Sequence, residues 1–335
     1  MTSDDRADEE PGGERNITVL LALAANIAVG ALKLAAGLIT GSGALLSEAA
    51  HSVGDSATEV LLLVALRRSD RPADRQHPFG YGKARYFWSL IAAGAIFVSG
   101  AAFSVYQGLH TIFGGGEDAS RLWINYPVLA LAFVFEGTSF LQAIRQVRST
   151  AERSRRSLRS VVREPDDPTV NSVAMEDSAA LVGLVVAAIG VGLHQLTGSR
   201  VWDGVASLVI GALLLLVAFV LAATCGELLI GKQANTRLLR SIEGFLEAEN
   251  EIVDVVDVLS MQIGTGRVLL CIRADFVDTV TAGDIEQACM RIDADLRERF
   301  AELDEIFIQP VPRGDPRIED RVRARYGRAL SGEKK

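Results

Sequence analysis

The sequence predicts an α-helical membrane protein with six transmembrane helices, followed by a smaller, polar α+β domain. Of its 335 residues, 49% are hydrophobic and 23% are charged, which is too apolar for an ordinary soluble domain. Nearly all the long apolar runs lie before residue 225, and about 20 mostly apolar residues cross a bilayer. Six crossings use roughly 120 residues and leave about 100 for one further domain. This pattern excludes a single soluble enzyme domain, a disordered protein and a repeat array.

Six apolar runs are long enough to cross a membrane. The predicted spans are residues 17–39, 44–66, 85–112, 124–146, 169–195 and 202–223. They define a membrane domain over residues 16–225, preceded by an acidic tail over residues 1–15. Because a secretory signal begins with basic residues, the first run is expected to remain as a membrane anchor.

The charged loops predict which side of the membrane each end faces. Arginine is concentrated in residues 67–85, between the second and third spans, and in residues 145–163, between the fourth and fifth. The other three loops carry at most one arginine each. Basic loops stay in the cytoplasm, so both termini are expected there. The net charge of −8 argues against nucleic acid as a partner, and the basic run at 145–163 is expected to lie against anionic lipid headgroups.

Residues 235–312 are predicted to form a compact α+β domain with the order helix, strand, strand, helix, strand. The segment 267–276 alternates as a half-buried strand does, with an inward face of Val268, Leu270, Ile272, Ala274 and Phe276. Apolar residues from Ile285 to Phe300 recur at helical spacing, which predicts an amphipathic helix. The charged tail at 313–335 is expected to be mobile.

Ionisable residues inside the predicted spans are the main functional signal, since a carboxylate near the bilayer centre costs about 3 kcal/mol. His51 and Asp55 are four residues apart in the second span, so they lie on one helical face. An imidazole and a carboxylate suit zinc, and also manganese, iron or cobalt. Asp177, with Glu176 beside it, is expected at a similar depth in the fifth span. The alternative is that these groups only join helices by hydrogen bonds. The other acidic residues of the second span are interpreted as structural or near a span end: Glu48 and Glu59.

Three motifs stand out along the chain. They are SEAAHSVGD at residues 47–55, HPFGYGK at residues 77–83, and DPT with EDSAA between residues 167 and 180. Together they resemble the cation diffusion facilitator family, and within it the subfamily of zinc transporter 9. The resemblance covers roughly residues 16–312.

This resemblance implies an architecture and an activity. It implies a cytoplasmic, ferredoxin-like fold for residues 235–312 and a homodimer embedded in a lipid bilayer, expected here to be a bacterial cell membrane. It also implies efflux of divalent cations, usually zinc, by proton antiport with alternating access. No enzymatic activity and no cofactor are expected apart from the transported cation and protons.

The resemblance further implies a cation site built from two residues of the second span and two of the fifth. Carried over onto this chain, its ligands are His51, Asp55 and Asp177. The usual fourth position is occupied by Val173, which has no donor atom, so Glu176 or water is left to complete the shell.

Two further family features are only partly matched. Some members hold a second cation in the loop between spans two and three. Asp74 and His77 match that set, but Tyr81 replaces its second histidine, so a weak or absent loop site is expected. Residues 224–335 contain no histidine, so this part is expected to dimerise by packing rather than through zinc.

Other functional classes stay open. A membrane metalloenzyme would need an activating residue beside the metal, and the sequence has no HExxH or serine nucleophile motif. A non-transporting membrane scaffold has no need for the ionisable residues of the second and fifth spans. Among transporters, an exporter of manganese, iron or cobalt is the alternative to a zinc exporter.

Overall fold

The computed structural model describes residues 12–114, 122–153, 168–312 and 314–326. Most of the acidic tail at 1–15 and part of the basic loop at 145–163 therefore lie outside the described residues. The chain divides into two compact units. The helical unit comprises Met1–Arg68 and Ala84–Gly226, and the C-terminal unit comprises Ser69–Lys83 and Glu227–Lys335.

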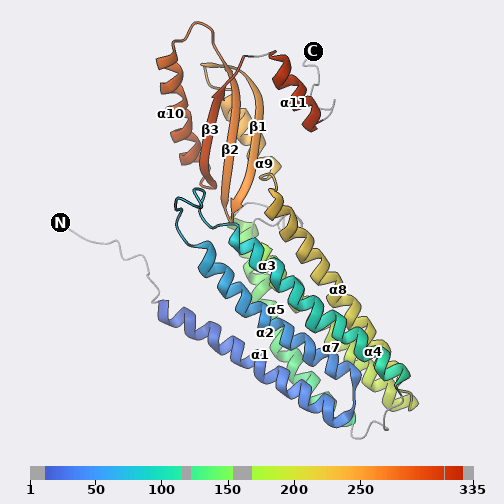
Figure 1. Ribbon diagram of the computed structural model, residues 1–335. Helices are drawn as coiled ribbons and strands as arrows, with labels where there is room; N and C mark the ends of the chain where they lie inside the picture. Colours follow the sequence, from blue (N-terminus) through green and yellow to red (C-terminus); the bar gives the residue numbers. More distant parts are fainter. Residues whose placement is uncertain (1–11, 115–121, 154–167, 313, 327–335) are drawn as a thin grey trace, which may run out of the picture. The chain divides into compact units, whose positions relative to one another are not determined.

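Within the described ranges, six helical stretches are long and apolar enough to cross a membrane, which confirms the six predicted spans. They are α1 (Gly12–Thr40), α2 (Gly43–Ser69), α3 (Ala84–Ala95) continuing through η1 (Ile96–Ala102) into α4 (Phe103–Phe113), η2 (Leu122–Ile124) with α5 (Asn125–Arg153), α7 (Pro168–Thr197) and α8 (Val201–Ile230) (Figure 1). The third span differs from a plain α-helix, because η1 is a π-helical segment.

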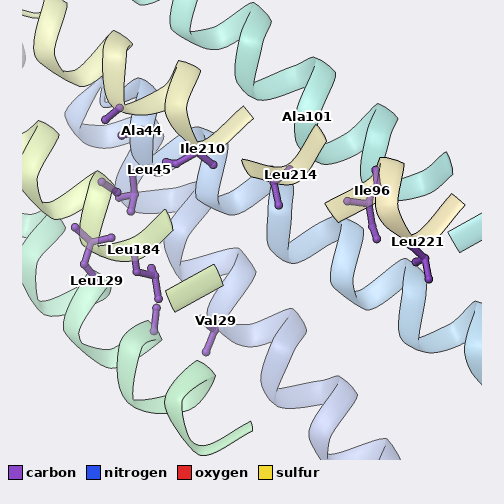
Figure 2. Packing of buried hydrophobic residues seen from close by; sticks show 14 of the residues in the cluster. Val29, Ala44, Leu45, Ile96, Ala101, Leu129, Leu184, Ile210, Leu214 and Leu221 are labelled. Atoms are coloured by element: carbon purple, nitrogen blue, oxygen red, sulfur yellow. The ribbon is translucent and has the colours of Figure 1, made fainter. Parts of the chain in front are cut away.

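Small and aliphatic side chains make up the core of the helical unit. Its buried members come from all six spans, and Figure 2 shows the packing of Val29, Leu45, Leu129, Leu184 and Leu214, among others. Large apolar residues also cover the outside of these helices; Phe219 is 70% exposed and Leu38 is 67% exposed. Outward-facing apolar side chains of this size are expected where helices meet lipid rather than water.

The C-terminal unit contains the predicted helix–strand–strand–helix–strand order. Its elements are α9 (Thr236–Leu246), β1 (Ile252–Gly264), β2 (Arg267–Phe276), α10 (Ala282–Arg299) and β3 (Leu303–Pro310). The sheet order is β1-β2-β3 (Figure 1), with β1 antiparallel and β3 parallel to β2. The parallel pair is joined by α10, because parallel strands need a crossover connection.

The predicted inward face of β2 is confirmed. Its residues alternate strictly between half-buried and buried from Arg267 on, and Val268 is the first buried residue. Buried side chains of α9, such as Ile242, and of α10, such as Ile292, join the same core. The fold is therefore a helical membrane protein with a C-terminal α+β domain, as the sequence predicts.

Part of the charged segment at 313–335 is helical. Pro316–Tyr326 forms helix α11, and Arg325 Nη1 in its last turn donates to Asp257 Oδ2 at 2.9 Å. Asp257 also accepts from Arg273 at 3.3 Å, and its side chain is only 2% exposed. A buried carboxylate needs cationic partners, so helix α11 supplies one of them.

The loop at residues 69–83 packs with the C-terminal unit. A Cβ added to Gly82 would collide with the carbonyl oxygen of Ile263 in β1, so only glycine permits this close approach. Lys83 Nζ donates to the carbonyl oxygen of Leu229 at 3.4 Å. Nearby, Glu227 accepts a hydrogen bond from Lys232 at 2.8 Å.

Candidate cation site in the helical unit

Helix α2 places His51 and Asp55 one turn apart, as their spacing predicts. The distance from His51 Nδ1 to Asp55 Oδ1 is 3.4 Å, and the His51 side chain is 2% exposed. Among the described residues, neither His51 Nε2 nor Asp55 Oδ1 has a hydrogen-bond partner. Buried polar atoms are rarely left unpartnered. This pair therefore offers a nitrogen and an oxygen donor to a further group.

Helix α7 carries the second pair of predicted ligands. Asp177 Oδ2 accepts a hydrogen bond of 2.8 Å from Ser139 Oγ of α5. Glu176 is 7% exposed, and its Oε1 has no hydrogen-bond partner in the described parts of the chain. Both carboxylates lie close enough to Asp55 to interact with it electrostatically. The α2 and α7 pairs therefore share one neighbourhood.

The four predicted ligands do not form a closed coordination shell. Among the described residues, no group of three or more histidine, cysteine or acidic side chains is gathered closely enough to hold a metal ion. Val173, one turn before Asp177, supplies no donor. The predicted ligands lie as two pairs, one on α2 and one on α7, and we call each pair a candidate half-site. Side-chain movement between these helices is needed to close them around a cation.

A buried charge cluster beside the α2 pair was not predicted from the sequence. Lys33 of α1 lies 3.2 Å from Glu48 Oε2 of α2 and 3.4 Å from Glu136 Oε1 of α5. Its Nζ also donates to Ser52 Oγ at 3.0 Å. The side chains of Lys33 and Glu48 are fully buried, and that of Glu136 is 11% exposed. We call Lys33, Glu48 and Glu136 the charge cluster.

The signal for this charge cluster was present in the sequence. Lys33 lies within the first predicted span and Glu136 within the fourth, where charged residues are rare and functional as a rule. The site predicted from the sequence, however, used only the ionisable residues of the second and fifth spans. Glu59 of α2 accepts a hydrogen bond from Asn26 Nδ2 of α1.

The loop residues Asp74 and His77 are adjacent, with 3.5 Å between Asp74 Oδ1 and His77 Nδ1. Asp74 is already engaged, because the Tyr81 hydroxyl donates to Oδ2 at 2.7 Å and the His77 backbone N–H donates to Oδ1 at 2.7 Å. The Tyr81 hydrogen bond is the main reason why the pKa of Asp74 lies below its ordinary value. A cation here would compete with these hydrogen bonds for the Asp74 carboxylate.

Comparison with known proteins shows that these helices match a protein family. Residues 19–230 match the family described as the cation efflux transmembrane domain. Over 244 residues the chain is 36% identical to the mitochondrial proton-coupled zinc antiporter SLC30A9 of Xenopus laevis, a match that covers 73% of this chain and 44% of that protein. The mouse antiporter of the same name is 33% identical over 244 residues, covering 73% of this chain and 43% of its own length.

A plant relative is also similar over most of this chain and over only part of its own length. Metal tolerance protein C4 of Arabidopsis thaliana is 31% identical over 258 residues, which cover 77% of this chain and 56% of that protein. The chain spans about half the length, or less, of these curated relatives. The two antiporters are transporters rather than enzymes by name, and the family match agrees with the resemblance carried by the three sequence motifs.

Proposed function

The chain belongs to the cation efflux family, and on that basis we propose that it exports divalent metal cations, with zinc as the substrate, in exchange for protons. The observation that carries the proposal is the set of buried donor atoms on α2 and α7 that have no hydrogen-bond partner among the described residues: His51 Nε2, Asp55 Oδ1 and Glu176 Oε1. Such atoms inside membrane-spanning helices mark an ion path.

The two half-sites suit a cation that is transported rather than stored. A divalent ion bound by His51 and Asp55 on α2 draws Asp177 and Glu176 of α7 toward it. The same carboxylates and imidazole bind protons, and protonation removes their lone pairs and negative charge. Protons entering from outside therefore release the cation. The relatives named proton-coupled zinc antiporters support this coupling, and rocking of helix groups around the site provides alternating access.

Manganese, iron or cobalt is the second candidate substrate, and the donor set is the observation that favours it. The half-sites offer the carboxylates of Asp55, Glu176 and Asp177 but only one imidazole, that of His51. Oxygen-rich sites suit harder cations, whereas zinc prefers nitrogen and sulfur. Transport assays therefore have to compare zinc with manganese.

The setting of this activity is also proposed. Two copies form a homodimer in a lipid bilayer, which we propose is a bacterial cell membrane. The C-terminal unit offers an apolar surface for a second copy, with Met290 76% exposed and Phe307 52% exposed. Met290 also lines a surface cavity of about 260 Å³, together with Cys289, Asp293, Ile306 and Ile308. Docking there needs no zinc.

Zinc flux into proteoliposomes tests the proposed function. With the full chain reconstituted and the lumen made acidic, external radioactive zinc should accumulate faster than without a pH gradient, because outward proton movement drives zinc inward. An ionophore that collapses the gradient should remove the acceleration. Zinc uptake equal to that of protein-free liposomes would contradict transport, and uptake that ignores the gradient would contradict antiport. Radioactive manganese in a parallel assay decides between the two substrates.

Topology gives a second prediction. We expect a cysteine at position 199, replacing Ser199, to react with an impermeant thiol reagent from outside a right-side-out vesicle, and a cysteine replacing Ser69 to react only after lysis. The arginine-rich loops are the reason, because they stay in the cytoplasm. The assay needs a background without the native cysteines Cys225, Cys271 and Cys289. Outside labelling at position 69 would invert the orientation and turn export into import.

A further inference from the structure

The charge cluster of Lys33, Glu48 and Glu136 holds one ammonium against two carboxylates, which leaves one net negative charge. We propose that this net charge sets the affinity of the neighbouring site for its cation. The inference rests on the proposed function, because it concerns the same cation bound between α2 and α7. It assigns a role to residues of α1 and α5, which contribute no ligand to the predicted site.

The charge cluster is fixed in place by its packing. Lys33 reaches two other helices, with its Nζ 3.2 Å from Glu48 and 3.4 Å from Glu136. The second oxygen of Glu48, Oε1, faces α7, where a Cβ added to Gly183 would collide with it. Glycine at that position leaves room for the carboxylate. Because Glu48 and Lys33 are fully buried, these charges cannot turn toward water when a cation arrives.

The charge cluster lies next to the predicted ligands. Ser52, which accepts a hydrogen bond from Lys33, follows His51 in the sequence of α2. The charges of all three cluster members act on both His51 and Asp55. Glu136 also acts on Asp177, whose hydrogen-bond donor Ser139 lies one turn along α5 from Glu136. Electrostatic interactions are strong in a buried, low-dielectric setting.

The surplus carboxylate distinguishes this arrangement from a structural ion pair. An ion pair of one ammonium and one carboxylate leaves no net charge, whereas here Lys33 joins three helices through two carboxylates and one negative charge remains. A buried negative charge without compensation is unfavourable. A cation held at Asp55 and Asp177 compensates the net negative charge of the charge cluster. This net charge therefore destabilises the empty site and stabilises the site with a bound cation.

The test compares variants that differ in the net charge of the cluster. Glu136→Gln and Glu48→Gln each bring the net charge to zero, and each should weaken zinc binding by about 10- to 100-fold, the size typical for groups just outside a metal's ligands. Adding Lys33→Met to either variant restores one net negative charge. Each double variant should therefore bind zinc within about fivefold of the wild-type protein. The measurement is isothermal titration of the purified full chain with zinc chloride.

A purely structural cluster gives the opposite result for the double variants. Losing Lys33 as well as a glutamate removes the remaining ion pair, so binding would stay weak or weaken further. That outcome, or wild-type affinity in both single variants, overturns the inference. Two double variants are available, so the test survives if one of them fails to fold.

A matched control uses another buried contact between α1 and α5. Thr40 Oγ1 donates to Asn125 Oδ1 at 2.9 Å, and neither group is charged. Thr40→Val should lower the melting temperature and leave zinc affinity unchanged. Asp177→Asn separates the inference from the function on which it rests. If that variant binds zinc like the wild type, the site itself is wrong; if it loses zinc while the charge-cluster variants bind normally, only the inference fails.

Discussion

Replacing Asp177 with asparagine should abolish zinc transport in proteoliposomes. Asparagine keeps the size of the side chain and can still accept the hydrogen bond from Ser139, so the packing of α5 against α7 is retained. What is lost is an anionic oxygen donor and the charge that compensates the cation. Loss of this charge from a ligand should weaken zinc binding by more than the roughly 10- to 100-fold that is typical for groups just outside a metal's ligands. The initial rate of radioactive zinc uptake should fall to that of protein-free liposomes.

Ser139→Ala is the matched control for Asp177→Asn. It removes the hydrogen bond to Asp177 but leaves the carboxylate and its charge. Since Ser139 positions Asp177 and does not bind the cation, transport should continue with a weaker apparent affinity for zinc. Wild-type uptake by Asp177→Asn would show that the ligand on α7 is a different residue, and complete loss of uptake in a folded Ser139→Ala variant would show that Ser139 does more than position Asp177.

Val173→His should shift the metal preference of the site toward zinc. Position 173 lies one turn before Asp177, so a side chain there shares a helical face with Asp177. A histidine adds a second imidazole to a site that otherwise offers three carboxylates and His51. Zinc gains more from nitrogen ligands than manganese does. The ratio of zinc to manganese affinity should rise by about tenfold or more, as measured by competition binding.

Val173→Leu is the matched control for Val173→His, and Glu176→Gln tests whether the second carboxylate of α7 binds the cation. Val173→Leu changes the shape of the side chain without adding a donor, so it should leave the metal preference unchanged. Glu176→Gln should weaken binding less than Asp177→Asn does, because Glu176 lies about 100° around the helix from Asp177. If Glu176→Gln binds zinc like the wild type, water completes the shell. An unchanged zinc-to-manganese ratio in Val173→His would mean that position 173 does not face the cation.

The elements that the sequence predicts well are those with a strong local pattern. The six spans follow from apolar length alone, and β2 follows from its strict alternation. The pair His51 and Asp55 was also predictable, because four residues along a helix bring side chains together wherever that helix lies. In each case the information resides within one continuous segment.

The features that the sequence does not predict depend on contacts between distant segments. Lys33 and Glu136 are 103 residues apart in the chain, and no local pattern pairs them. The contact that helix α11 makes with Asp257 was not predicted, because Asp257 lies 68 residues before Arg325 in the chain. The loop at 69–83 belongs to the C-terminal unit through its packing against β1, which only the assembled fold reveals.

Zinc binding by purified Asp55→Ala tests the central claim most directly. Asp55 belongs to the α2 half-site, and its carboxylate also interacts with both carboxylates of the α7 half-site. Isothermal titration of the full chain should therefore show loss of the zinc-binding signal in Asp55→Ala, while the variant keeps a cooperative melting transition. Wild-type zinc affinity in Asp55→Ala would contradict a cation site between α2 and α7.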